Sequence, residues 1–169
     1  MSYSIEPLRE EDVRVMLGWR YAPPYDIYDL AGADDASTVA ALLDPAQNYF
    51  AVRTGDGDLV GFCCFGADAR VPGWDYAGGA LDVGIGMRPD LTGQGHGYAF
   101  VAAVMAYGLR RFPHAQVRAT IAVFNERSQR VFLRHGLREI GRFTRSGAPP
   151  LAFVVMAGAA EASGSAPPL

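Results

Sequence analysis

The chain has 169 residues, of which 50% are hydrophobic and 20% are charged. That length suits a single domain, and it is enough to bury a core without disulfides or metal ions. The formal net charge of −3 argues against a protein whose main partner is nucleic acid. All 15 basic residues are arginine, so the chain has no lysine side chain that can be acylated.

The sequence predicts a cytoplasmic protein with no membrane partner. Its first residues, MSYSIEPLREED, lack the basic and apolar regions of a signal peptide. The longest apolar run, Tyr98–Leu109, falls well short of the ~20 residues that a membrane span needs. Cys63 and Cys64 are adjacent on an expected strand and fit a reducing compartment better than a disulfide. No His, Cys or acidic cluster has metal-ligand spacing, so no metal is expected.

The first elements are a strand and two helices. A strand is predicted over Ser2–Leu8, and a helix from the charged run that begins at Arg9 to about Trp19. Tyr21–Tyr28 holds two prolines and three tyrosines, which excludes an ordinary helix and indicates an ordered loop with an aromatic surface. A second helix is predicted over Asp34–Leu43.

Strands dominate the rest of the chain, in the order β-α-α-β-β-β-α-β-α-β-β. The connection Gly66–Gly79 is a candidate for substrate contact, since loops carry function more often than frameworks do. The domain is expected to span residues 1–157, and the small, Pro-rich remainder, 158–169, to be a disordered tail. The predicted elements are a hairpin of Asn48–Arg53 and Leu59–Phe65, a strand over Ala80–Met87, a helix over Gly97–Phe112, a strand over Val117–Phe124, a helix over Glu126–His135, and strands over Leu137–Phe143 and Leu151–Met156.

The segment Leu81–Leu109 organises the chain. A short apolar strand stops at Pro89, and a loop with Gly93, Gly95 and Gly97 leads into an apolar helix. This arrangement offers backbone N–H groups and a helix N-terminus to a phosphate, although an isolated glycine pattern is also found in plain tight connections. No Gly-Lys-Ser/Thr follows, and the G-x-G-x-G spacing deep in the chain fails the Rossmann pattern. A plain nucleotide-binding protein is therefore disfavoured.

Two motifs together resemble the GCN5-related N-acetyltransferase (GNAT) superfamily. Pro89–Tyr98, PDLTGQGHGY, is similar to its acyl-CoA signature, (Gln/Arg)-x-x-Gly-x-(Gly/Ala), with Thr92 in place of the first Gln or Arg. Asn125–Leu137, NERSQRVFLRHGL, is similar to its second motif, Asn-x-x-(Ala/Ser)-x-x-(hydrophobic)-Tyr-x-x-x-Gly-Phe, with Phe132 in place of the tyrosine. The resemblance extends over most of residues 3–157. It implies an α/β (α+β) fold with a mixed, mostly antiparallel sheet of six to seven strands and helices on both faces.

The resemblance also implies acetyl-CoA as the co-substrate. In this family two central strands splay apart, and the pantetheine arm pairs with the fourth strand like an added strand. An N–H from that strand can stabilise the oxyanion, an effect worth roughly 3–4 kcal/mol per good donor. The implied cofactor-binding residues are Ile85, Gly86 and Met87 of the strand, Thr92, Gly93, Gln94, Gly95, His96, Gly97 and Tyr98 of the loop, and Asn125 and Phe132 of the second motif.

Some of these residues have a structural alternative. Asn125 also suits simple helix capping, and His96 also suits a solvent-facing position in the loop. Four arginines recur three or four residues apart and form either a solvated helix face or a contact for the 3′-phosphate of CoA: Arg127, Arg130, Arg134 and Arg138.

Proton transfer leaves several alternatives open. An amine arrives as ammonium and must lose a proton, for which a carboxylate is the usual base. Asp82 stands where related proteins carry an acidic residue, but it suits a structural pair with an arginine equally well; Asp26 and Asp75 are the other candidates. Because Phe132 replaces the tyrosine that protonates CoA thiolate, water, Ser128 or a loop tyrosine takes that role, or catalysis is weak.

Tyr25, Asp26 and Tyr28 fall where GNAT proteins vary the loop over the acceptor site, and an aromatic wall with one carboxylate suits a cationic amine. The sequence thus predicts an N-acetyltransferase that moves acetyl from acetyl-CoA to a primary amine, by direct attack in a ternary complex. The acceptor is a small amine, an amino acid, an antibiotic or a protein N-terminus. The alternative is a catalytically weak acyl-CoA-binding sensor or partner module. A homodimer paired through the strands after Leu137 is the candidate assembly.

Overall fold

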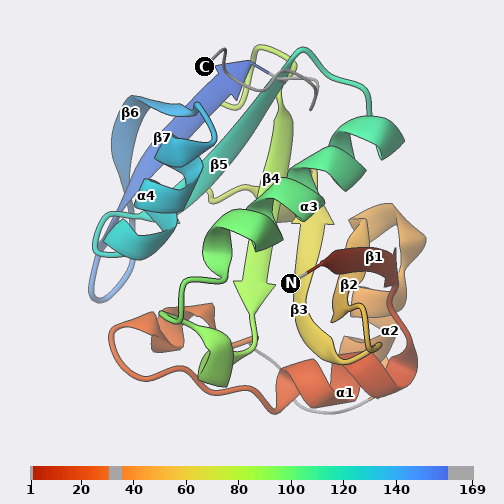
Figure 1. Cartoon of the computed structure of the whole chain (residues 1–169). Helices are drawn as coiled ribbons and strands as arrows, with labels where there is room; N and C mark the ends of the chain where they lie inside the picture. The colour runs from red at the N-terminus through yellow and green to blue at the C-terminus, as the bar shows by residue number, and fades with distance from the viewer. Residues whose placement is uncertain (1, 31–35, 160–169) are drawn as a thin grey trace.

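The computed structural model describes residues 2–30 and 36–159. One sheet of seven strands forms the frame of the molecule, and helices cover both of its faces (Figure 1). The elements follow each other as β1 (Tyr3–Pro7), α1 (Glu10–Leu17), η1 (Tyr25–Tyr28), α2 (Ala36–Leu43), η2 (Pro45–Gln47), β2 (Tyr49–Thr54), β3 (Leu59–Phe65), η3 (Ala67–Ala69), β4 (Leu81–Met87), η4 (Pro89–Leu91), α3 (Gly97–Arg111), β5 (Gln116–Ala122), α4 (Glu126–Arg134), β6 (Arg138–Arg145) and β7 (Leu151–Ala159).

The strand order in the sheet is β1-β2-β3-β4-β5-β7-β6. All neighbouring strands pair antiparallel except β4 and β5, which are parallel. The predicted fold class, a mixed and mostly antiparallel sheet within an α/β arrangement, is confirmed. The order of strands and α-helices agrees with the prediction, whereas the four short 3₁₀ helices were not predicted.

The two faces of the sheet have separate cores. The larger core joins Phe100, Val101 and Val104 of α3 and Phe132 of α4 to sheet residues. On the opposite face, α1 and α2 pack against each other, and Met16 and Trp19 pack on Phe62 of β3. Burial of this apolar surface contributes roughly 25 cal/mol per Å² and holds the helices in place.

The last strand is longer than predicted. β7 continues through Gly158 and Ala159, which pair with Val117 and Gln116, so the strand extends beyond the predicted domain end at residue 157. Ladder hydrogen bonds need only the backbone, and small side chains therefore gave no sign of this continuation. The expected start of the second helix at Asp34 and Asp35, and the tail from residue 160, lie outside the described residues.

A wedge-shaped gap opens between β4 and β5. The two strands pair only at Leu81–Val117 and Asp82–Arg118. Beyond this point β4 stays paired with β3 as far as Met87, and β5 stays paired with β7 as far as Ala122. Each strand therefore keeps its outer neighbour and loses its inner one, which confirms the splay that the sequence resemblance implied.

Candidate functional site

The glycine loop lies between the end of β4 and the start of α3. Gly93 and Gly95 have φ angles of +78° and +87°, a left-handed conformation that glycine adopts without steric cost. Within the described part of the chain, the N–H groups of residues 93–96 donate to no protein acceptor. Together with the N-terminus of α3, this bare backbone can bind an anionic group.

Two side chains of the loop brace it from within. The Thr92 hydroxyl donates to the Pro89 carbonyl at 2.8 Å, and the Gln94 amide donates to the carbonyl of Asp90. Both side chains are thereby occupied by the protein itself. The half-buried His96 precedes the first helical residue, so its ring lies at the positive end of the helix dipole.

Arg127 lies against this loop. A side-chain carbon built on Gly93 would come within 2.9 Å of an Arg127 guanidinium nitrogen, so the charge is adjacent to the bare N–H groups. The guanidinium also lies 4.1 Å from the centre of the Tyr25 ring, and its Nε donates to the Tyr25 hydroxyl at 3.1 Å. A fixed positive charge at this place favours an anion in the loop.

The four arginines of the predicted stripe are all exposed but make different contacts. Arg130 pairs with the exposed Glu126 at 2.7 Å, and Arg138 donates to the carbonyls of Leu133 and Leu137. Arg134 lies 4.5 Å from the centre of the Tyr98 ring. Of these four arginines, Arg127 is the one whose guanidinium lies beside the glycine loop, at Gly93.

Tyr98, at the start of α3, belongs to a second cluster near the loop. Its ring stacks on His135 with 4.1 Å between ring centres, and a His135 ring nitrogen contacts the Tyr98 carbonyl at 2.9 Å. Partial burial lowers the pKa of His135, with Arg134 adding to that effect. Tyr98 remains 41% exposed next to the loop.

The tyrosine loop, defined here as residues 21–28, bridges the open end of the wedge (Figure 1). The Tyr21 hydroxyl donates to the Met87 carbonyl on β4 at 2.7 Å. The Tyr28 hydroxyl accepts from the Ala122 N–H on β5 at 3.2 Å and from the Asn125 side-chain amide at 3.3 Å. Tyr25 and Tyr28 both pack on Phe124. The loop therefore contacts both walls of the gap.

The second motif forms the start of α4. The Asn125 side-chain oxygen accepts from the Ser128 N–H at 3.2 Å, so this residue caps the helix as its structural alternative predicted. Its amide nitrogen donates to the Tyr28 hydroxyl at the wedge, so one side chain both caps α4 and contacts the tyrosine loop. Ser128 is half-buried one turn into the sequence motif. Phe132 is only 1% exposed and packs in the larger core, so its ring has no open surface for a cofactor.

Asp82 lies at the closed end of the wedge and is 2% exposed. Its carboxylate accepts from Arg118 Nε at 2.6 Å, from Arg118 Nη2 at 2.9 Å and from Arg70 Nε at 2.7 Å. Arg118 is itself buried, and its hydrogen bonds to Asp82 raise its pKa. Its remaining donors bind the carbonyls of Ala77 and Tyr76. This is the arginine-paired arrangement that the sequence left as one of two alternatives.

The other candidate carboxylates differ in their surroundings. Asp75 accepts from the Ala77 N–H at 3.1 Å, as a turn residue does. Asp26 is exposed on η1, between Tyr25 and Tyr28. Of these, only Asp26 presents its carboxylate at the tyrosine loop.

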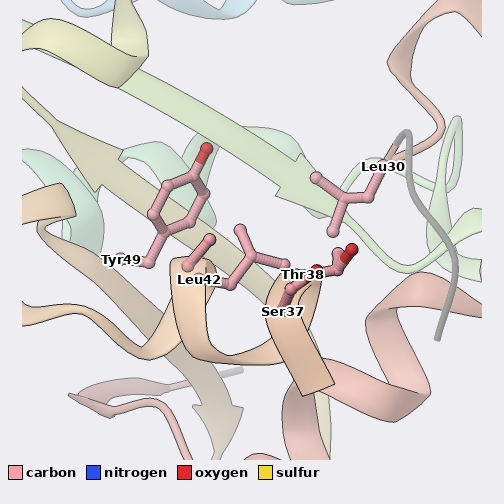
Figure 2. A pocket seen from close by; sticks show the side chains of 6 residues that line it. Leu30, Ser37, Thr38, Leu42 and Tyr49 are labelled. Carbon is pink, nitrogen blue, oxygen red and sulfur yellow. The ribbon is translucent and has the colours of Figure 1, made fainter. Parts of the chain in front are cut away.

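A cavity of about 420 Å³ lies beside α2, on the face of the sheet opposite α3 (Figure 2). Leu30 and Tyr49 lie on opposite sides of it, and α2 supplies the remaining wall. Sequence reasoning did not identify this cavity, because its lining residues carry no chemical motif and meet only in the fold. They are Leu30, Ser37, Thr38, Ala41, Leu42 and Tyr49.

Structural comparison identifies the class of this fold. The chain superimposes on a GNAT-family acetyltransferase from Bacillus anthracis with a TM-score of 0.73 at 18% identity, covering 95% of this chain and 96% of the other. A spermidine N-acetyltransferase chimera of Vibrio cholerae gives 0.69 at 14% identity, covering 95% and 97%. A putative phosphinothricin N-acetyltransferase gives 0.67 at 13% identity, covering 95% and 100%. At these identities the likeness establishes the acetyltransferase fold alone.

The sequence establishes the family. Residues 4–138 match the model of the acetyltransferase (GNAT) domain, and the chain belongs to this family. No curated protein sequence matches it. In the part of the chain that the structure describes, no helix is both long and apolar enough to cross a membrane.

Proposed function

We propose that the protein transfers an acetyl group from acetyl-CoA to a primary amine by direct attack in a ternary complex. One arrangement carries this proposal: the wedge beside Ile85–Met87 opens next to a loop whose N–H groups at residues 93–96 are free of protein acceptors. A pantetheine arm laid along β4 would bring the pyrophosphate to that loop and the thioester into the wedge. An N–H of β4 would then stabilise the oxyanion.

The acceptor amine would approach from the face that carries α1 and α2. The cavity beside α2 lies on that side of the sheet, and Tyr25 with Asp26 at the open end of the wedge offers an aromatic ring and a carboxylate to an ammonium group. Structural neighbours that are named for spermidine acetylation support an amine acceptor. In this proposal a cytoplasmic location and a homodimer through the edge strand β6 remain predictions.

Asp82 is assigned a structural role in this proposal. A general base must accept a proton from the nucleophile, directly or through one water. The Asp82 carboxylate is buried, and both of its oxygens already accept hydrogen bonds from guanidinium groups. Water, or Asp26 acting through water, would therefore receive the proton of the ammonium. Phe132 is also assigned a structural role, because its side chain is buried in the core.

The test is release of free thiol from acetyl-CoA across a panel of amines that includes polyamines, amino acids, aminoglycosides and short peptides. Saturable thiol release with at least one amine is the expected result. Binding of acetyl-CoA without thiol release on any amine would favour the acyl-CoA-binding sensor. Saturable binding of ATP or NAD with none of CoA would contradict both.

Arg127 is expected to contribute to cofactor affinity. Replacement by alanine removes the guanidinium that lies against Gly93 of the glycine loop, and should raise the KM for acetyl-CoA by about tenfold, equivalent to ~1.4 kcal/mol. The kcat should stay close to the wild-type value, because the contact is made equally in the ground and transition states. Steady-state kinetics at fixed ionic strength provide the measurement.

Arg130→Ala is the matched control, because Arg130 lies on the same helix and pairs with the exposed Glu126. It should leave the KM unchanged. Equal KM values for wild type and Arg127→Ala would remove this arginine from the cofactor site.

A further inference from the structure

The hydroxyl of Tyr28 occupies the inner edge of β5. Along this strand the N–H of Val123 bonds to Ala152 of β7, whereas the N–H of Ala122 bonds to Tyr28. Since successive N–H groups of a strand point to opposite sides, the Ala122 N–H faces away from β7 and toward β4. The Tyr28 oxygen therefore lies in the gap between the diverging strands, where the proposed function places the thioester.

The Tyr28 hydroxyl acts as an acceptor in both of its hydrogen bonds. It accepts from the Ala122 N–H and the Asn125 amide and, among the residues that the structure describes, donates to none. Its own proton is thus available to a group in the wedge. The same two donors would stabilise a phenolate oxygen once that proton has left, without any rearrangement of the protein.

The ionisation of Tyr28 agrees with such a role. Burial raises its pKa above the ordinary value, and the two hydrogen bonds act in the opposite direction. The group is consequently protonated at neutral pH. Asn125, the family motif residue that caps α4, is what links this hydroxyl to the second motif.

The family's usual donor is missing from this chain. Position 132 is a phenylalanine that is 1% exposed, and it has no proton to give. Ser128 carries an aliphatic hydroxyl, which is a much weaker acid than a phenol. Tyr21 bonds through its own proton to Met87, and Tyr25 lies at Arg127 outside the strand edge. Tyr28 is the remaining tyrosine of the loop.

We propose that Tyr28 is the proton donor to the departing CoA thiolate, an inference that rests on the proposed function. As the tetrahedral intermediate collapses, its carbonyl re-forms and the C–S bond breaks, with the electron pair going to sulfur. The phenolic proton of Tyr28 passes to that sulfur, which gives free CoA thiol and a phenolate held by Ala122 and Asn125. The phenolate then takes a proton from water. The acceptor nitrogen gives up two protons, one as ammonium before attack and one from the tetrahedral intermediate. One of them balances the proton delivered to the thiolate, and the other is released to solvent.

Tyr28→Phe is expected to lower kcat with acetyl-CoA by about 10²–10⁴-fold while the dissociation constant for CoA changes little. The decisive measurement repeats the assay with an acetyl thioester of a nitro-substituted thiophenol, whose thiolate is stable and leaves without protonation. With this donor the deficit of Tyr28→Phe should shrink to within about threefold of the wild type. A purely structural tyrosine would give equal deficits with both donors.

Two further variants complete the test. Tyr25→Phe, on the same 3₁₀ helix, should show the same relative rate with both thioesters, and so should Ser128→Ala. A Tyr28→Phe protein that keeps the wild-type kcat with acetyl-CoA, or loses equal activity with both thioesters, would overturn the proposal. If the wild type releases no thiol with any amine of the panel, the proposed function itself is wrong.

Discussion

Replacing Asp82 with alanine is expected to lower the free energy of unfolding by about 3–5 kcal/mol. The reason is the partner left behind: Arg118 is 3% exposed and would keep its charge in a buried site without a carboxylate. Arg70 offers no compensation, because it carries the same sign of charge. The site also joins β4 to β5 at one of their only two paired positions. Urea-induced unfolding provides the measurement, with the midpoint and the slope compared between variants.

A double variant distinguishes the cost of an unpaired buried charge from a general loss of packing. In Asp82→Ala/Arg118→Met both charges of the buried pair are gone, and part of the lost stability should return, since replacing both partners by apolar groups is often nearly neutral. Asp90→Ala removes an exposed aspartate that also pairs with an arginine, and it should leave the urea midpoint unchanged. An Asp82→Ala midpoint equal to that of the wild type would refute the account.

The same position also decides between a structural carboxylate and a catalytic base. Asp82→Asn keeps the shape of the side chain, and thiol release per folded molecule should stay within about threefold of the wild type. A loss of 10²-fold or more with the fold intact is the range expected for a general base. That outcome would reassign the proton transfer to Asp82.

The order of the strands and helices was predictable because the residues that begin and end them act locally. Pro89 and the three glycines that follow it define the end of β4 and the start of α3, and their chemistry requires no distant partner. The second motif was likewise readable from Asn125 to Gly136, because a cap and a C-terminal glycine both act within one turn of the helix.

Contacts between residues far apart in the sequence could not be predicted from such local patterns. Asp82 and Arg118 are 36 residues apart, and the sequence left their pairing as one of two equal alternatives. The tyrosine loop was expected to be ordered and aromatic, yet its hydrogen bonds span 66 residues to Met87 and 94 residues to Ala122. Helical spacing alone placed four arginines on one stripe, whereas Arg127 contacts Tyr25 of η1 and Arg134 contacts Tyr98 of α3.

Replacing Asp12 with alanine is expected to lower the free energy of unfolding by about 3–5 kcal/mol. Asp12 is 4% exposed, and its two oxygens have separate functions. One accepts from the Arg9 N–H at 3.0 Å at the start of α1, and the other accepts from Arg53 Nη2 on β2. A variant without this carboxylate loses a helix cap and deprives a buried guanidinium of its buried carboxylate partner. The urea midpoint is the measured quantity.

Glu6 also lies near Arg53 but does not substitute for the Asp12 carboxylate. Glu6 lies 3.4 Å from Arg53 Nε, yet within the described chain that nitrogen makes no hydrogen bond, so Glu6 cannot replace the lost contact at Nη2. Glu10→Ala is the control, because Glu10 lies in the same first turn and pairs with Arg14 in an exposed contact, and exposed pairs contribute little. α1 leads directly into the tyrosine loop, so thiol release should fall in Asp12→Ala at urea concentrations where wild type and Glu10→Ala remain active. Equal urea midpoints for Asp12→Ala and Glu10→Ala would show that the buried Asp12–Arg53 pair stabilises the fold no more than an exposed pair does.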